Sequence, residues 1–240
     1  MNLKLITFIT TVALSFGCSS VSNTYVSLAS DNEKEIAIKR AYESFGMIYA
    51  KRQGSDSPAL IGTLFAVSNT HMITAAHVCL GVLSNQILRD FEQDIYVRHL
   101  NKDMEMVESS GLEIVNVDTK DDLCLLKKSN HGFTPLSIAS MEEVKTRDKV
   151  TILGAPMGVF PFETEGRIAY VDAYKAVGDK IFKGKLLLTA QAFGGNSGGP
   201  VLDSHGKVVG VLVMGYRPYP QISVATNAER LNLFIQKYGK

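Results

Sequence analysis

The chain reads Phe-Gly-Gly-Asn-Ser-Gly-Gly-Pro over Phe193–Pro200, and this stretch decides how the remaining sequence is interpreted. Glycine tolerates positive φ and has no Cβ, so the chain can turn tightly here and bring its backbone close to other groups. The turn displays the hydroxyl of Ser197, and the N–H groups of Gly195 and Ser197 are placed to bind an oxyanion beside it. A Gly-x-Ser-x-Gly pattern also fits a structural turn, so the rest of the chain has to decide between the two.

Two further segments contain the partners that a nucleophilic serine needs. Residues 72–77 read Met-Ile-Thr-Ala-Ala-His, a strand end that runs into a tight turn, and His77 is the candidate general base. Residues 121–126 read Asp-Asp-Leu-Cys-Leu-Leu, and Asp122 is the candidate acid that orients the imidazole. The chain order His77, Asp122, Ser197 excludes an α/β-hydrolase, in which the acid and then the histidine follow the serine.

In this order the three motifs resemble those of the trypsin-like (chymotrypsin-fold) serine proteases, most closely their bacterial HtrA-like and glutamyl-endopeptidase-like branches. The resemblance covers the chain from about Phe45 to the C-terminus. The matching pieces are Thr74-Ala75-Ala76-His77, Asp122-Leu123-Cys124-Leu125-Leu126 and Gly195-Asn196-Ser197-Gly198-Gly199-Pro200. The resemblance implies an all-β fold of two packed six-stranded antiparallel β-barrels with a C-terminal α-helix.

The resemblance also implies a mechanism and a set of roles. It implies a serine endopeptidase that acts on protein or peptide substrates through an acyl-enzyme intermediate. His77 would take the proton of Ser197, Asp122 would fix the tautomer of His77, and the N–H groups of Gly195 and Ser197 would form the oxyanion hole. Two rival functions remain, a catalytically inactive protease-fold binding module at the membrane surface and a serine esterase.

By the same resemblance, three segments line the pocket for the side chain that precedes the cleaved bond. The expected substrate-binding residues are Gln191, Ala192, Val213, Met214, Gly215 and Ser223. Gln191 stands at the floor position, and without a carboxylate there a buried Lys or Arg would lose its hydration and gain no partner. We therefore expect cleavage after small or medium apolar residues. A glutamyl preference is the alternative, and only Ser223 and Thr189 offer hydroxyls for it.

Two departures from the family pattern bear on regulation. Asn196 stands where many trypsin-like zymogens have an Asp that pairs with a new N-terminus, so activation by that route is not expected. The residues after Ser197 leave room for the last strands and a helix, but not for the PDZ domain that usually follows an HtrA-like protease domain.

Composition fits a globular protein of this kind. The chain has 240 residues, of which 45% are hydrophobic and 20% charged, enough for a core of one all-β domain or two lobes. The formal net charge is +1 and the basic residues are scattered, which gives no electrostatic case for a nucleic-acid partner. No metal or organic cofactor is expected, because the remaining histidines show no ligand spacing. We expect surface or turn positions for them: His71, His99, His131 and His205.

Strand patterns and turn residues divide the protease domain, residues 44–240, into two barrels with the active site in the cleft between them. The first barrel covers about 44–129, in six or seven segments: 44–52, 59–68, 71–75, 91–100, 104–108, 112–118 and 123–127. The second barrel and terminal helix cover about 148–240, with strands at 149–154, 163–174, 185–192, 200–202, 207–215 and 221–225. Asn227 is expected to cap the closing helix, Ala228–Tyr238.

The N-terminal residues predict export from a bacterial cell. Residues 1–17 read as a signal peptide, because a short basic start precedes an apolar run that is too short to span a bilayer. The following Cys18 resembles a lipobox cysteine, although the lipobox leucine lies one residue too early. Lipidation of Cys18 would place the protein on the membrane in the envelope or periplasm; ordinary signal cleavage or an unmodified thiol are the alternatives, with secretion. Residues 18–43 are expected to form a tether and a short helix.

Cys79 and Cys124 form the candidate disulfide, since each lies two residues beyond a triad member in an oxidising compartment. Two buried free thiols are the alternative.

Overall fold

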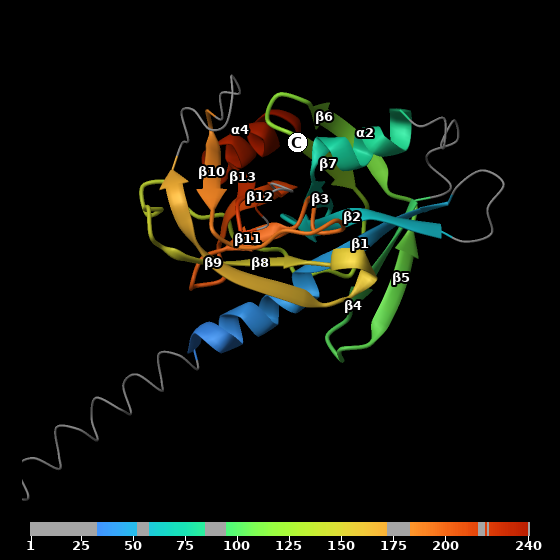
Figure 1. Cartoon of the computed structure of the whole chain (residues 1–240). Coiled ribbons are helices and arrows are strands. Elements are labelled where there is room, and N and C mark those ends of the chain that lie inside the picture. The colour runs from blue at the N-terminus through green and yellow to red at the C-terminus, as the bar shows by residue number, and fades with distance from the viewer. Residues whose placement is uncertain are drawn as a thin grey trace, which may run out of the picture.

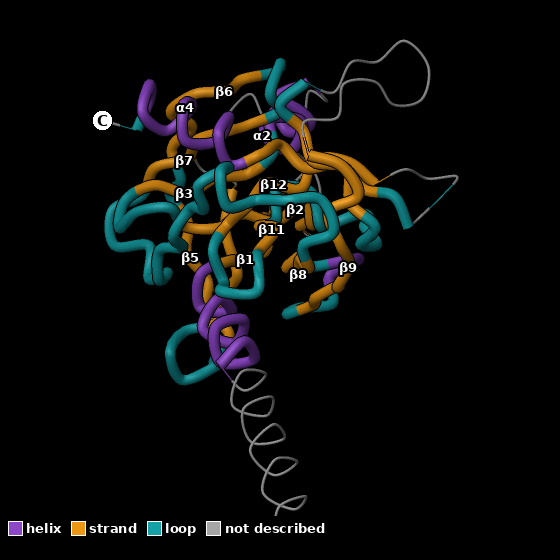
Figure 2. Tube along the Cα trace, turned by 90° about the vertical axis from the view of Figure 1, so that its left-hand side faces the viewer, coloured by secondary structure: helices purple, strands orange, loops and turns teal. Residues whose placement is uncertain are grey.

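The structure, a computed structural model, describes residues 33–51, 58–84, 95–171, 183–215, 219 and 221–239. The predicted signal peptide, Cys18 and most of the predicted tether lie outside the described residues. A helix over residues 33–41 falls where the short helix is predicted, and η1 (Tyr42–Ser44) follows it. Two β lobes come next, with the helix over 33–41 and α4 (Ala228–Tyr238) on opposite sides of them (Figures 1 and 2). Of the described helices, none combines the length and apolar character that crossing a bilayer requires.

The first lobe is an antiparallel sheet of seven strands in the order β5-β4-β1-β2-β3-β7-β6. Their bounds are β1 Phe45–Lys51, β2 Pro58–Ala66, β3 His71–Thr74, β4 Ile95–Leu100, β5 Met106–Ser110, β6 Glu113–Asp118 and β7 Leu123–Lys127. The closed six-stranded barrel expected for this lobe is therefore replaced by a seven-stranded sheet. Only Gly111, at φ 76°, and Leu112 separate β5 from β6. Because β5 and β6 are the two edges of the sheet, this short turn makes the sheet curl until its edges meet at one corner.

The second lobe is a closed six-stranded barrel in the order β10-β13-β12-β11-β8-β9, as predicted. Its strands are β8 Lys149–Gly154, β9 Phe162–Val171, β10 Lys185–Leu188, β11 Pro200–Leu202, β12 Val208–Gly215 and β13 Ser223–Asn227, and η2 (Pro156–Gly158) follows β8. The closing helix α4 begins where predicted, with the Asn227 side chain accepting a hydrogen bond from Arg230 N at 3.0 Å. Leu231 and Phe234 of α4 are buried against the barrel.

Two hydrophobic clusters contain side chains of both lobes, and one of them illustrates the packing. It contains Phe45, Phe65 and Leu125 from the first lobe together with Leu153 and Val211 from the second. Burial of shared apolar surface fixes the lobes against each other, since separating them would expose these side chains to water. The interface between the two lobes is thus part of the core.

Candidate active site

His77 and Asp122 are brought together by two adjoining strand ends in the first lobe. The register of β3 on β7 pairs Thr74 with Cys124, so the residues after β3 lie beside those before β7. His77 is the second residue of α2 (Ala76–Ser84), where the sequence predicts a tight turn. The run from Ala76 to Leu80 contains no glycine or proline and continues as helix.

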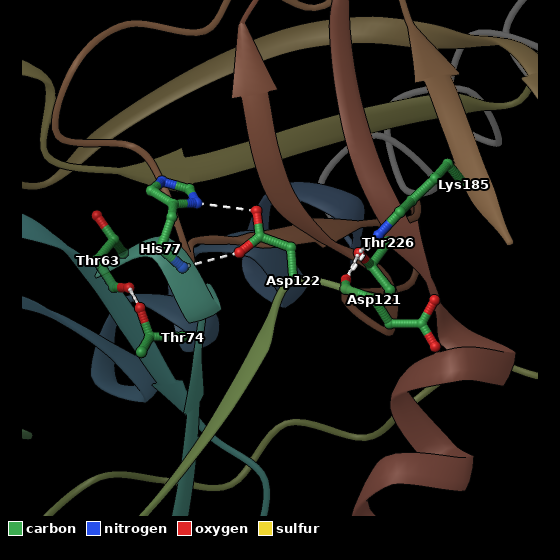
Figure 3. A network of polar contacts seen from close by, with 7 residues as sticks. All are labelled: Thr63, Thr74, His77, Asp121, Asp122, Lys185 and Thr226. Atoms are coloured by element: carbon green, nitrogen blue, oxygen red, sulfur yellow. Dashed lines mark hydrogen bonds and ion pairs between the residues drawn. The ribbon is translucent and has the colours of Figure 1, made fainter. Parts of the chain in front are cut away.

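The contact between the two side chains has two points (Figure 3). Asp122 Oδ2 lies 2.8 Å from His77 Nδ1, and Asp122 Oδ1 accepts the backbone N–H of His77 at 2.8 Å. Burial opposes ionisation of Asp122, but the hydrogen bonds and charge of His77, together with the charge of Lys185, outweigh it and lower the pKa of this carboxyl. The ionised carboxylate of Asp122 can only accept hydrogen bonds. It therefore holds the proton of His77 on Nδ1, which leaves Nε2 as the base.

The Ser197 loop requires glycine for steric reasons. Gly195 has φ 107° and Gly198 has φ 86°, both in the region that L side chains rarely adopt. A Cβ on Gly195 would lie 2.2 Å from the Ala155 carbonyl oxygen, and one on Gly198 would lie 2.1 Å from Thr74 Oγ1. The chain therefore packs closely on both lobes at this turn.

Two buried threonines of the first lobe hold the loop that carries Ser197. Thr63 donates its backbone N–H to the Ser197 carbonyl at 2.8 Å and its hydroxyl to the Gly195 carbonyl at 2.7 Å. Thr74 Oγ1 donates to the Thr63 carbonyl at 2.7 Å. Thr63 is not among the site residues predicted from the sequence. The signal that points to Thr63 is its hydroxyl within the otherwise apolar strand β2, because a buried hydroxyl needs a hydrogen-bond partner.

The predicted oxyanion donors are free to bind a ligand. Gly194 O accepts the N–H of Met157 at 2.9 Å, and in a trans peptide the following N–H, that of Gly195, points the opposite way. Within the described part of the chain, neither Gly195 N–H nor Ser197 N–H donates a hydrogen bond. The Ser197 hydroxyl likewise makes no hydrogen bond to the His77 ring there. Triad contacts commonly tighten only when substrate binds.

Asn196, the residue before Ser197, is 1% exposed and points toward Gly154. Its Oδ1 has no hydrogen-bond partner among the described residues. The position where trypsin-like zymogens place an ion-paired Asp is thus occupied by a buried neutral amide.

The predicted pocket residues divide into two groups. Ala192 lies against Gly215, where an added Cβ would be 2.9 Å from Ala192 O, and Ser223 pairs with Gly215 in the sheet. Val213 and Met214 precede Gly215 in β12, and Val213 is buried. Gln191 is exposed, and its carbonyl accepts the Thr164 hydroxyl at 2.8 Å. The structure thus brings Ala192, Gly215 and Ser223 together and leaves Gln191 at the surface.

Both hydroxyls considered for a glutamyl preference are already bonded within the protein. The buried Ser223 hydroxyl donates to the Ala190 carbonyl at 2.8 Å. Thr189 Oγ1 accepts the N–H of Arg167 at 2.9 Å.

In the structure a disulfide links Cys79 of α2 to Cys124 of β7, with their Cα atoms 6.6 Å apart. It lies two residues beyond both His77 and Asp122.

The expectation for the other histidines is wrong for three of them. His71, His99 and His131 are buried, and His99 stacks on Phe133 with ring centroids 4.0 Å apart. The sequence gives no sign of this for His99 and His131, because His99 contacts Phe133 and His131 contacts the Ser68 carbonyl, both from distant segments. His71, in contrast, contacts its near neighbours Ser68 and Thr70. His205 is exposed, as predicted, with its side chain 79% accessible. Among the described residues, no group of three or more His, Cys, Asp or Glu is arranged to hold a metal.

Comparison with known proteins agrees with this geometry. Residues 62–211 match the profile of the trypsin-like peptidase domain, and the chain belongs to this family. Similar curated proteins include a probable periplasmic serine endoprotease DegP-like of Halomonas elongata, 25% identical over 158 residues, 65% of this chain and 30% of that protein. The magnetosome formation protease MamE of Paramagnetospirillum magneticum is 33% identical over 130 residues, 51% of this chain and 17% of that protein. The chain thus spans less than a third of the length of both relatives.

Solved structures show the same fold. Deg5 superposes with a TM-score of 0.67 at 19% identity, over 84% of this chain and 91% of that one. The serine endoprotease of Yersinia pestis gives 0.64 at 20% identity, over 86% of this chain and 65% of that one. The chymotrypsin-like architecture predicted from the three motifs is therefore confirmed.

Proposed function

We propose that the protein is a serine endopeptidase that cleaves proteins or peptides through His77, Asp122 and Ser197. The observation that carries the proposal is the two-point contact of Asp122 with His77 in one lobe, combined with the Ser197 loop of the other lobe, which packs on Thr74 and Ala75. Among the described residues, the two N–H groups of this loop that would bind an oxyanion donate no hydrogen bond. An inactive binding module would have no need for this combination. The family membership supports the same reaction class.

The steps follow from the roles of these groups. Ser197 Oγ bonds to the substrate carbonyl carbon while its proton passes to His77 Nε2, and the oxyanion lies on the N–H groups of Gly195 and Ser197. The C–N bond then breaks, the amine leaves with the proton from His77, and an acyl ester remains on Ser197. Water loses a proton to His77 and attacks the ester, which releases the acid and restores the hydroxyl.

The substrate is proposed to bind as an extended strand beside the end of β12. Met214 and Gly215 supply backbone groups there, as in other cases of strand addition. Ala192 and Gly215 leave little space between them, and Ser223 is occupied by Ala190. These contacts support small apolar side chains before the cleaved bond, and the bonded hydroxyls argue against a glutamyl preference. Cleavage-site profiling on a peptide library tests this, and dominant cutting after Lys, Arg or Glu would contradict it.

We further propose that the protein is exported and held in the bacterial envelope by lipid on Cys18. The H. elongata relative is named as periplasmic, which supports export. Cell fractionation tests the anchor: the wild type is expected in the membrane fraction and Cys18→Ser in the soluble fraction. A Cys18→Ser protein that stays in the membrane fraction contradicts the proposal.

The function itself is tested with an unstructured protein substrate. Purified protein is expected to degrade casein, and Ser197→Ala is expected to be inert at equal concentration. A folded wild type that cleaves simple esters but leaves casein intact would indicate an esterase. A folded wild type that cleaves neither would indicate a binding module.

A further inference from the structure

A buried lysine of the second lobe contacts the chain directly before the catalytic acid (Figure 3). Lys185 is the first residue of β10 and is 7% exposed. Its Nζ donates to the Asp121 carbonyl at 2.6 Å and to Thr226 Oγ1 at 2.5 Å. The Thr226 hydroxyl, from β13, donates to the same carbonyl at 2.5 Å. Two side chains of the second lobe thus converge on one backbone oxygen of the first.

A contribution to stability alone does not explain why a charged side chain is buried here. A buried ammonium loses its hydration, and uncharged residues of similar size often stabilise a protein core equally well. Burial lowers the pKa of Lys185, while the carboxylates of Asp121, Asp122 and Asp118 favour its charged form and Arg230 opposes it. Within the described residues, no carboxylate oxygen lies in ion-pair distance of its Nζ. A neutral donor would satisfy the carbonyl equally well, so the charge calls for another explanation.

The oxygen that Lys185 holds belongs to the peptide that leads into Asp122. A peptide unit is planar, so fixing the Asp121 carbonyl fixes the Asp122 nitrogen as well. Asp122 has φ 55°, a conformation that non-glycine residues rarely adopt and that the surroundings must enforce. From this conformation its carboxylate reaches both the ring and the backbone N–H of His77. The orientation of the peptide before Asp122 therefore determines where the carboxylate points.

We propose that Lys185, assisted by Thr226, is a positioning residue of the triad: from the second lobe it holds the Asp121 carbonyl and so keeps the Asp122 carboxylate on His77. The proposal rests on the proposed peptidase function. It makes the acid half of the site depend on contact between the lobes. The positive charge of Lys185 also favours the ionised form of Asp122.

Four variants of the full-length protein test this. Lys185→Met keeps the length of the side chain and removes the donor, and Thr226→Val keeps the shape and removes the hydroxyl. Thr226→Ser keeps the hydroxyl and is the matched control for the second. Lys120→Met is the control for the first, because Lys120 is exposed in the turn beside Asp121 and, among the described residues, its side chain makes no hydrogen bond or ion pair while its backbone N–H bonds Asp118.

Two readouts separate positioning from folding. The first is the split between kcat and KM, and the second is the low-field proton resonance that a His77 Nδ1–H gives while bound to Asp122. We expect Lys185→Met to lower kcat by about 10- to 100-fold with KM nearly unchanged, as misplacement of a catalytic group does, and to weaken or remove the resonance. Thr226→Val should act in the same direction with a smaller effect, and both controls should match the wild type.

A Lys185→Met protein with wild-type kcat and an intact resonance overturns the proposal. A loss of activity with the resonance intact and the melting temperature lowered also overturns it, because the role is then structural. If Lys185→Met does not fold, Thr226→Val against Thr226→Ser decides by the same criteria. The resonance reports on the His77–Asp122 pair even if the wild type cleaves nothing, so failure of the proposed function is seen separately in the casein assay.

Discussion

The proposed acid–base half of the site and the proposed nucleophile half are held in different ways. In the acid–base half, the Asp122 side chain accepts two hydrogen bonds from His77, one from the ring and one from the backbone N–H. In the second, Ser197 is placed by its backbone: by glycines at positive φ and by Thr63, which reaches across from the other lobe. Apart from the reacting groups themselves, the geometry of the acid–base half therefore fails when a side chain is removed, whereas the loop of the nucleophile half also fails when a side chain is added to a glycine.

The largest expected effect is the same for both halves of the site. Ser197→Ala and His77→Ala should each abolish proteolysis, by about 10⁶-fold in kcat, because triad residues act as a unit. For the same reason the double variant should be no worse than either single variant. Progress curves on a fluorogenic peptide measure all three. A double variant clearly slower than both singles would mean that the two halves act independently.

Within the acid–base half, the two adjacent aspartates should separate sharply. Asp122→Asn should lower kcat by roughly 10⁴-fold, since the amide favours the wrong imidazole tautomer. Asp121→Asn should be mild, because Lys185 and Thr226 bond the backbone carbonyl of Asp121, which this substitution leaves in place. Steady-state kinetics on both variants decide. A greater loss in Asp121→Asn would show that the orienting acid is assigned to the wrong residue.

Within the nucleophile half, two glycines four residues apart should behave in opposite ways. The added Cβ of Gly198→Ala would meet Thr74 Oγ1 at 2.1 Å and Thr63 O at 2.3 Å, whereas that of Gly194→Ala meets nothing within 4 Å. Displacing the loop removes an oxyanion donor, which costs about 10²- to 10³-fold in kcat. Gly194→Ala should remain close to wild type. Equal activity of the two variants would contradict the close packing of the loop on the first lobe.

The disulfide between Cys79 and Cys124 lies in the acid–base half, and it should contribute to the stability of the protein but not to its activity. Intact-mass analysis after alkylation without reductant should find neither residue modified. Cys79→Ser/Cys124→Ser should lose about 2 to 4 kcal/mol of unfolding free energy, as for other loop-closing disulfides, and keep its activity when folded. Alkylation of both thiols in the native oxidised protein would show that the bond does not form.

The smallest effect is a pH dependence of stability that arises in the first lobe. Burial lowers the pKa of His71, His99 and His131 below 6.5. The unfolded chain then binds protons first, so the stabilisation is present above about pH 6.5 and is lost as pH falls, by up to about 1.4 kcal/mol per pH unit for each proton. Urea unfolding on both sides of that pH measures the slope. His99→Leu should flatten it, with His205→Leu on an exposed hairpin as control; an unchanged slope in His99→Leu contradicts this origin.

The strands of both lobes were predictable from the sequence, whereas the way the first sheet closes was not. The predicted bounds of β7, β8 and β11 agree with the structure, because turn residues lie close to the ends of each strand. The seven strands of the first lobe fall on the seven predicted segments. Its open sheet and the burial of His99 and His131 were not predictable, since both depend on contacts between distant segments. The triad residues stand out because their chemistry requires local motifs. Thr63 and Lys185 do not, because their partners lie in the other lobe and no local pattern marks them.

Reaction with a fluorophosphonate probe tests the central claim most directly. The wild type is expected to gain the mass of one adduct, located on Ser197 by peptide mapping, with no adduct on Ser197→Ala and much slower labelling of Asp122→Asn. A folded, mature wild type that gains no adduct, or gains it on another residue, would contradict the assignment of this site.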